Sequence, residues 1–293
     1  MANLKDIRLR IKSVKNTQQI TKAMKMVSAA KLNRAQENIT NLRPYAKNLL
    51  SLIADIATTK RVTHELLEQN DNPKKILLVV VASDRGLCGG FNTSINKFAE
   101  KFLKENKNVF EQLDILIVGK RALDYFKRRD VEPVESILNL AKDVSYDLAS
   151  GVADKLINSF TSGDYDEVRF VYNEFKSVLS QELTVEKILP VDIKSSVFLS
   201  SEKGSFSEDL IFEPSPEEMI DVLLKKHFSV QVYRILSESV AAEHAARMTA
   251  MDNATTNAKE MINTLTLTFN KLRQAAITTE LTEICSGAEA IKS

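Results

Sequence analysis

The sequence has few of the residues that interrupt helices. It contains no Trp, and only 8 Gly and 6 Pro occur among its 293 residues. Sandwich and barrel folds need many turns, which are rich in Gly and Pro, so this scarcity favours long helices. Apolar residues make up 44% of the chain, which is enough for one large core or two modest ones.

Cysteines and long apolar runs are also scarce. The two cysteines, Cys88 and Cys285, lie far apart, and neither belongs to a redox pair or a zinc-ligand pattern. This spacing favours free thiols in a reducing compartment. No segment approaches the ~18 apolar residues of a membrane span, and Lys5, Asp6 and Arg8 lie where a signal peptide would be apolar. We therefore expect a cytosolic or membrane-peripheral chain.

Acidic residues are almost absent from residues 1–34, where Asp6 is the single acid among nine Lys and Arg. Such a basic segment is typical of a solvated coiled-coil flank, of a surface for an acidic protein partner, or of a nucleic-acid binder. Nucleic acid is the weakest of these alternatives, because no aromatic residue precedes Tyr45. Ser28, Ala29 and Ala30 stand where a membrane-binding helix would need bulky anchors.

The N-terminal segment, residues 1–58, is predicted to be one long helix. It has no Gly from Leu4 to Ala57, and its apolar residues recur in steps of three and four, with a change of phase between Val14 and Ile20. Pro44 is expected to bend the helix without ending it. The predicted stripe consists of Leu4, Ile7, Ile11, Val14, Ile20, Met24, Val27, Ile39, Leu42, Ala46, Leu49, Ile53 and Ile56.

A second long helix is predicted over residues 215–288. Ser215 suits the N-cap and Pro216 the first helical position, and no further Gly or Pro occurs before Gly287. Because each helix carries a narrow stripe that needs a partner, we expect the two to form an antiparallel coiled coil. The stripe of the second helix consists of Ala258, Ile262, Leu265, Phe269, Leu272 and Ala276.

The pattern changes between the two helices, over residues 74–210. Apolar β-branched runs predict strands, and helical patterns lie between them. This alternation predicts a small, Rossmann-like, mainly parallel sheet, so the fold class is α/β with long helices. The expected strands are 75–82, 113–119, 168–172 and 181–188, the expected helices are 92–104 and 145–162, and 195–209 is expected to be a loop.

A Gly-rich loop, residues 83–92, follows the first predicted strand. Such a position can hold a phosphate, but the loop lacks the Gly-Lys-Ser/Thr of a P-loop and the glycine spacing of a dinucleotide site. We therefore expect no cofactor here, and a tight turn formed by Gly86, Gly89 and Gly90 with Asn92 as the cap of the next helix. A nucleotide-using α/β enzyme with helical arms is the alternative.

Four segments of the chain, residues 19–32, 83–92, 243–251 and 270–281, resemble those of gamma subunits of bacterial F-type ATP synthases, and the resemblance covers the whole chain. It implies a non-catalytic rotor shaft that couples ion-driven rotation of a c-ring to ordered conformational changes in the catalytic β subunits. The implied partners are three α and three β subunits, an epsilon subunit and the c-ring, with one copy of this chain per complex. The implied location is peripheral, on the cytoplasmic face of the inner membrane, with no direct binding of nucleotide or nucleic acid.

The same resemblance assigns roles to residues in the matching segments. Met24 and Lys25 are expected near the acidic lever of a β subunit. Glu213, within residues 210–214, is expected at the c-ring. Polar contacts between the shaft and the α/β ring are expected from Arg247, Gln274, Thr278 and Glu280.

Overall fold

The computed structural model describes residues 4–59, 64–70, 72–138, 144–178, 180–192 and 215–292. The contacts divide the chain into an end unit, Met1–Ser28 with Met248–Ser293, and a main unit, Ala29–Arg247. The elements are α1 (Leu4–Thr59), η1 (Glu65–Leu67), β1 (Lys75–Val81), α2 (Phe91–Asn106), β2 (Gln112–Val118), α3 (Lys120–Lys127), β3 (Glu135–Ile137), α4 (Tyr146–Thr161), β4 (Glu167–Phe175), β5 (Gln181–Leu189) and α6 (Pro216–Lys292).

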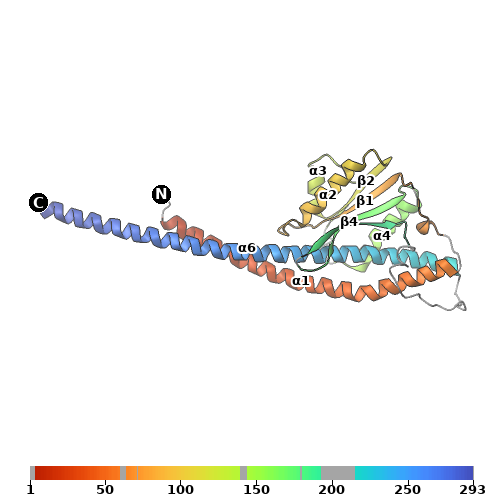
Figure 1. Cartoon of the computed structure of the whole chain (residues 1–293), viewed down its shortest axis with the longest axis horizontal. Coiled ribbons are helices and arrows are strands. Elements are labelled where there is room, and N and C mark those ends of the chain that lie inside the picture. The colour runs from red at the N-terminus through yellow and green to blue at the C-terminus, as the bar shows by residue number, and fades with distance from the viewer. Residues whose placement is uncertain are drawn as a thin grey trace. The chain divides into compact units, whose positions relative to one another are not determined.

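The main unit contains a five-stranded sheet in the order β3-β2-β1-β4-β5 (Figure 1). The first four strands in this order are parallel, and β5 pairs antiparallel with β4. Alternating side chains of the central strand β1 serve opposite faces. Leu78 and Val80 pack with α2 and α3, whereas Leu77 and Val79 pack with α4 and with parts of α1 and α6. The predicted α/β class, with long terminal helices and a mainly parallel sheet, is confirmed.

Helix α1 runs without interruption through Pro44 over its 56 residues. Figure 1 shows that its ribbon changes direction in its second half, as expected from a proline that removes one backbone donor. Within the main unit, Leu32 and Ile39 of α1 pack against Ala241 and Ala245 of α6. Small side chains on α6 allow the two helices to approach closely in this part of the fold.

Helix α6 is 77 residues long and begins as predicted. The Ser215 Oγ accepts a hydrogen bond from the Glu218 backbone N–H at 3.2 Å, which satisfies one of the free donors at the helix start. Among the described residues, no helix is both long enough and apolar enough to cross a bilayer.

In the end unit, α1 and α6 pair in antiparallel fashion. The Arg8 guanidinium lies 5.8 Å from the centre of the Phe269 ring, while further along α1 the Thr21 Oγ1 lies 2.8 Å from the Thr255 Oγ1. Numbers that rise along α1 meet numbers that fall along α6, so this contact is the predicted coiled coil. Of the predicted stripe on α6, Ala258 is buried, but Ala276 is exposed.

The predicted change of phase in the α1 stripe is wrong. Ile20 and Val27 are 60% and 57% exposed, whereas Thr21 and Ser28 are only 8% and 2% exposed. The buried face therefore continues from Ile7 in steps of three and four and passes through small polar residues. We call the buried face of α1 that contacts α6 the seam. Thr21 and Ser28 lie in the seam, and their apolar neighbours Ile20 and Val27 point outward.

Candidate functional site

The Gly-rich loop, residues 83–92, is closed by side chains at its two ends. The Ser83 backbone N–H donates to the Asn92 Oδ1 at 3.0 Å, and the Ser83 Oγ donates to the Arg85 carbonyl at 2.6 Å. The predicted capping role of Asn92 is wrong, because the N-cap of α2 is Gly90 and it has no side-chain cap. Asn92 lies inside the helix, and its amide instead ties the loop to the end of β1.

Two residues of the loop adopt the left-handed conformation. Gly89 has φ of 57°, which glycine tolerates without cost, and Leu87 has φ of 64°. For a residue with a Cβ, this conformation costs about 1 to 2 kcal/mol. The Leu87 side chain is nevertheless 63% exposed, so burial of that side chain does not explain the strain.

Helix α6 holds the loop through Arg247. The Arg247 Nη2 and Nε donate to the Gly86 carbonyl at 3.2 and 3.4 Å, and Nη2 also lies 2.6 Å from the Glu243 carboxylate. A third guanidinium nitrogen, Nη1, lies 3.3 Å from the His244 Nδ1. The Arg247 side chain is only 8% exposed, so its donors are used within this chain. A ring contact by Arg247 stays a prediction.

Burial governs the titration of the groups around Arg247. It raises the pKa of the Glu243 carboxyl, although Arg247 opposes the rise. Burial, helped by the positive charge of Arg247, lowers the pKa of His244 to about 4. Burial also raises the pKa of the Cys88 thiol, which Arg247 only partly opposes. Cys88 is therefore a protonated thiol at neutral pH, which disfavours a role as a nucleophile.

Ligands of doubly wound sheets usually bind in the crevice beyond the carboxyl ends of the strands. In this chain α6 lies across that place. Val81, Asp84 and Val118 from the sheet side face a set of α6 side chains, and a cavity of about 20 Å³ is left between them. A small-molecule pocket normally has about 300 Å³ or more. The α6 side chains that line the cavity are Leu236, Ser239, Val240 and Glu243.

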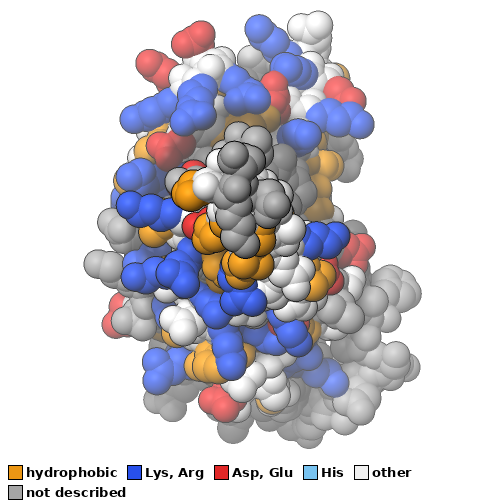
Figure 2. Space-filling view, turned by 90° about the vertical axis from the view of Figure 1, so that its left-hand side faces the viewer, with side chains coloured by type: hydrophobic (Ala, Val, Ile, Leu, Met, Phe, Trp, Pro, Cys, Tyr) orange, Lys and Arg blue, Asp and Glu red, His pale blue; other side chains and the backbone are white. Residues whose placement is uncertain are grey.

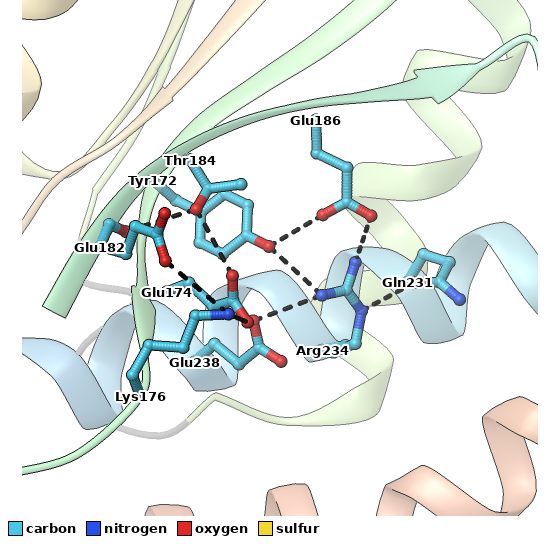
Figure 3. A network of polar contacts seen from close by, with 9 residues as sticks. All are labelled: Tyr172, Glu174, Lys176, Glu182, Thr184, Glu186, Gln231, Arg234 and Glu238. Atoms are coloured by element: carbon cyan, nitrogen blue, oxygen red, sulfur yellow. Dashed lines mark hydrogen bonds and ion pairs between the residues drawn. The ribbon is translucent and has the colours of Figure 1, made fainter. Parts of the chain in front are cut away.

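A second polar network joins α6 to the sheet, and sequence reasoning missed it. Arg234 of α6 lies 2.6 Å from the Glu186 carboxylate of β5 and donates to the Tyr172 hydroxyl of β4 at 3.2 Å (Figure 3). Arg234 also pairs with Glu238, four residues along the same helix, at 3.3 Å. Burial alone would lower the pKa of Arg234, but the acidic neighbours, Glu186 above all, raise it. The four-residue spacing to Glu238 is visible in the sequence, whereas the partners on the strands are not.

The remaining predicted site residues lie on the two long helices. Met24 is half-buried, and the Lys25 Nζ lies 2.6 Å from the Asp252 carboxylate within the end unit. Gln274, Thr278 and Glu280 of α6 are all exposed. Glu213 lies outside the described residues. In the part of the chain that the structure describes, no three His, Cys, Asp or Glu side chains gather as a metal site.

The end unit also exposes apolar side chains that the sequence stripe had assigned inward or left out. On α1, Ile20, Met26 and Val27 are 57% to 60% exposed. Toward the end of α6, Leu281 and Ile284 are 57% and 68% exposed, and Figure 2, which faces this end, shows apolar side chains grouped there. Apolar groups presented together on a surface mark sites of protein contact.

The comparisons with known proteins agree with one another. A family model described as ATP synthase matches residues 3–291. The ATP synthase gamma chain of Bdellovibrio bacteriovorus is 59% identical over the full length of both chains, and that of Geobacter sp. strain M21 is 48% identical, also over the full length of both.

Among solved structures, a chain of the Euglena gracilis mitochondrial ATP synthase, in an assembly of OSCP, F1 and c-ring, aligns with a TM-score of 0.67 and 25% identity. The alignment covers 98% of this chain and 94% of that one. A chain of the central stalk and c-ring of the Tetrahymena thermophila mitochondrial ATP synthase aligns with a TM-score of 0.61 and 27% identity, covering 80% of this chain and 99% of that one. The chain described here therefore belongs to the ATP synthase gamma chain family.

Proposed function

We propose that this gamma chain is the central rotor shaft of an F-type ATP synthase and that it carries no catalytic site of its own. As a subunit of that complex, it couples ion-driven rotation of a c-ring to ordered changes in the β subunits that make ATP. In reverse, ATP hydrolysis turns the shaft and pumps ions. The observation that carries the proposal is the antiparallel pair of long helices, whose exposed faces are chemically unlike.

A rotor needs surfaces that differ in chemistry from one side of the shaft to another. A shaft can bias one β subunit toward binding and another toward release only if its contacts with them differ in free energy. In the end unit, α1 is strongly basic and exposes Ile20 and Val27. The end of α6 has no such excess of Lys and Arg, and it exposes polar residues, Gln274, Thr278 and Glu280, together with the apolar Leu281 and Ile284. Rotation therefore presents a different surface to each β subunit in turn.

We assign the contacts as follows. Met24 and Lys25 meet the acidic lever of a β subunit, where the basic charge of α1 speeds and orients the encounter. Gln274, Thr278 and Glu280 make polar contacts with the α/β ring, which has three copies of each subunit. Glu213 and its neighbours meet the c-ring, and the epsilon subunit binds beside them. The complex lies on the cytoplasmic face of the membrane, with one copy of this chain.

The alternative of a nucleotide-using enzyme has the Gly-rich loop as its best support. Against it stand the filled crevice beyond the strand ends and the engagement of the loop by Arg247. Titration of the purified chain with ATP and with NAD separates the two functions. Binding at micromolar concentrations would contradict the proposal.

Affinity purification from native membranes tests the proposal most directly. A tag on this chain is expected to recover α and β subunits in a 3:3:1 ratio with it, as judged by quantitative mass spectrometry, together with the c-ring and epsilon. A chain with Ile20 and Val27 both changed to Asp is the control for specificity. It is expected to fold but to recover less of the ring. Recovery of the tagged chain alone would refute the assignment.

A further inference from the structure

The backbone of the Gly-rich loop is strained at Leu87 and is held in that strained conformation by its contacts. Leu87 adopts a left-handed conformation at φ of 64°, although it is not a glycine and its side chain is 63% exposed. Strained residues persist only where the surrounding structure over-determines them. The restraint must therefore come from the backbone contacts of the loop, because the Leu87 side chain itself is largely in solvent.

One of these contacts ties the loop to α6. The Gly86 carbonyl, which accepts from Arg247 at 3.2 and 3.4 Å, belongs to the peptide group that joins Gly86 to Leu87. A planar peptide group turns as a unit. Holding its oxygen therefore sets the plane from which the φ of Leu87 is measured.

Arg247 is itself held in place. The Glu243 carboxylate, one helical turn earlier on α6, lies 2.6 Å from the Arg247 Nη2, and the two side chains are 4% and 8% exposed. A buried guanidinium with a fixed partner donates in fixed directions, which an exposed and mobile side chain would not do. The pair thus aims two donors at one carbonyl oxygen.

We propose that Arg247 is a positioning residue: its guanidinium, oriented by Glu243, holds the Gly-rich loop on α6 in the conformation that presents Arg85 and Leu87 outward. The loop then moves as one part with the segment of α6 that belongs to the main unit. That the presented side chains meet a partner subunit rests on the proposed function, whereas the positioning itself does not.

Cys88 supplies a reporter for the positioning. It lies next to Leu87, is 2% exposed, and its Sγ is 3.2 Å from the Asn92 Nδ2. In a full-length chain with Cys285→Ser, Cys88 is the only thiol, and its reaction rate with a disulfide reagent at neutral pH measures opening of the loop. Arg247 favours the Cys88 thiolate and lowers the pKa of the thiol more than Glu243 raises it, so loss of both charges would slow the reaction. A faster reaction therefore reports opening and not electrostatics.

The variant Arg247→Met with Glu243→Gln removes the contact without leaving a buried charge unpaired. It is expected to raise the Cys88 rate about ten-fold or more. Glu243→Gln alone keeps the guanidinium but removes the carboxylate that orients it, so its Cys88 rate is expected to lie between those of the parent and of the double variant. Arg234→Met with Glu238→Gln removes the other network of the same helix and is the control for a general loss of stability, so it is expected to accelerate Cys88 clearly less than the Arg247 variant does.

An unchanged or slower rate in the Arg247 variant would overturn the proposal, and so would an equal acceleration in the Arg234 control. If the double variant does not fold, Arg247→Lys decides. Its single ammonium keeps the charge beside Glu243 but cannot reproduce the two-donor contact, so its rate should exceed that of the parent. A parent-like rate in that variant would also overturn the proposal.

Incorporation into the complex separates this inference from the proposed function. Fast Cys88 reaction together with a lower ratio of ion pumping to ATP hydrolysis supports both the positioning and the presentation to a partner. A lower ratio with a parent-like Cys88 rate would instead make Arg247 a direct ring contact and overturn the positioning role. Fast Cys88 reaction with normal coupling would overturn the presentation to a partner.

Discussion

At the scale of single residues, the ionisable groups buried along α6 determine how the chain responds to pH. His227 is 4% exposed, and its Nδ1 has no hydrogen-bond partner among the described residues. Burial lowers the pKa of His227 to about 4, with a smaller contribution from the charge of Arg234. Buried carboxyls behave in the opposite sense, because burial raises the pKa of Glu238 and favours its neutral form.

The His227 site predicts a loss of stability in mild acid. An unfolded histidine takes up a proton near pH 6.5, whereas the folded one remains neutral until about pH 4. The free energy of unfolding should therefore be unaffected by this group above pH 6.5 and should fall between pH 6.5 and 4, by about 2 to 3 kcal/mol.

Urea unfolding at a series of pH values checks this, with His227→Gln as the control that cannot titrate in this range. The parent should lose more stability than the variant on acidification, and the difference isolates His227 from the other titrating groups. Parallel pH profiles would contradict the assignment.

Arg234 carries a second prediction at this scale. Arg234→Met leaves the carboxylates of Glu186 and Glu238 without their common partner, and the free energy of unfolding should fall by about 3 kcal/mol. Adding Glu238→Gln removes one of the unpaired charges and should recover part of the loss. Denaturant unfolding of both variants measures this, and identical stabilities of the single and the double variant would exclude the coupling.

At the scale of elements, the two long helices and most of the sheet could be predicted because each depends on a local pattern. Helix α3 and strand β3 were missed because they have only 8 and 3 residues, too few to show a period. The α1 stripe was misplaced because Thr21 and Ser28 lie in the seam, while Ile20 and Val27 point outward. Hydrophobicity cannot identify a buried face that contains hydroxyl groups.

The seam therefore predicts a stabilising substitution. The Thr21 and Thr255 hydroxyl oxygens lie 2.8 Å apart, and each also lies within hydrogen-bond distance of a carbonyl of its own helix, so two hydroxyl protons are shared among three contacts. Valine has nearly the same shape, and replacing both partners of a buried polar pair by apolar groups is neutral or stabilising. Thr21→Val with Thr255→Val should slow hydrogen exchange of backbone amides in the end unit, corresponding to a rise of about 1 kcal/mol in the free energy of local opening.

Thr278→Val is the control for the seam, because Thr278 is exposed and its hydroxyl bonds only the Gln274 carbonyl of its own helix. It should leave exchange in the seam unchanged. Faster exchange in the double valine variant would show that the threonine pair stabilises the coiled coil more than apolar packing does.

At the scale of the whole molecule, the sequence predicted the rotor through family resemblance, because single residues do not reveal what surrounds a coiled coil. The two polar networks centred on Arg234 and Arg247 could not be predicted from the sequence. Their partners lie on strands and loops at sequence separations of 48 residues for Glu186 and 161 for Gly86. Unlike the two long helices, whose apolar stripes each indicate the need for a partner, these single side chains carry no pattern that points to their partners.

The prediction for the whole molecule concerns the coupling of ion flow to ATP synthesis. Met24→Lys adds a charge at the proposed lever contact and should lower ATP synthesis and ATP-driven ion pumping more than ATP hydrolysis. The matched control is Val109→Lys, which also places a lysine at an exposed apolar position, 67% exposed, but in the main unit. Both activities are measured in the assembled, membrane-bound complex, and equal losses in the two variants would argue against the placement of Met24.

The pairing of α1 with α6 also has a consequence for biosynthesis. The Thr21–Thr255 contact joins residues 234 positions apart, so α1 leaves the ribosome long before its partner residues on α6 exist. Until α6 follows, the inward side chains of α1, such as Ile7 and Ile39, have no helix to cover them. The nascent chain must therefore carry an uncovered apolar stripe through most of its synthesis. We therefore expect α1 to be a segment that chaperones bind during synthesis.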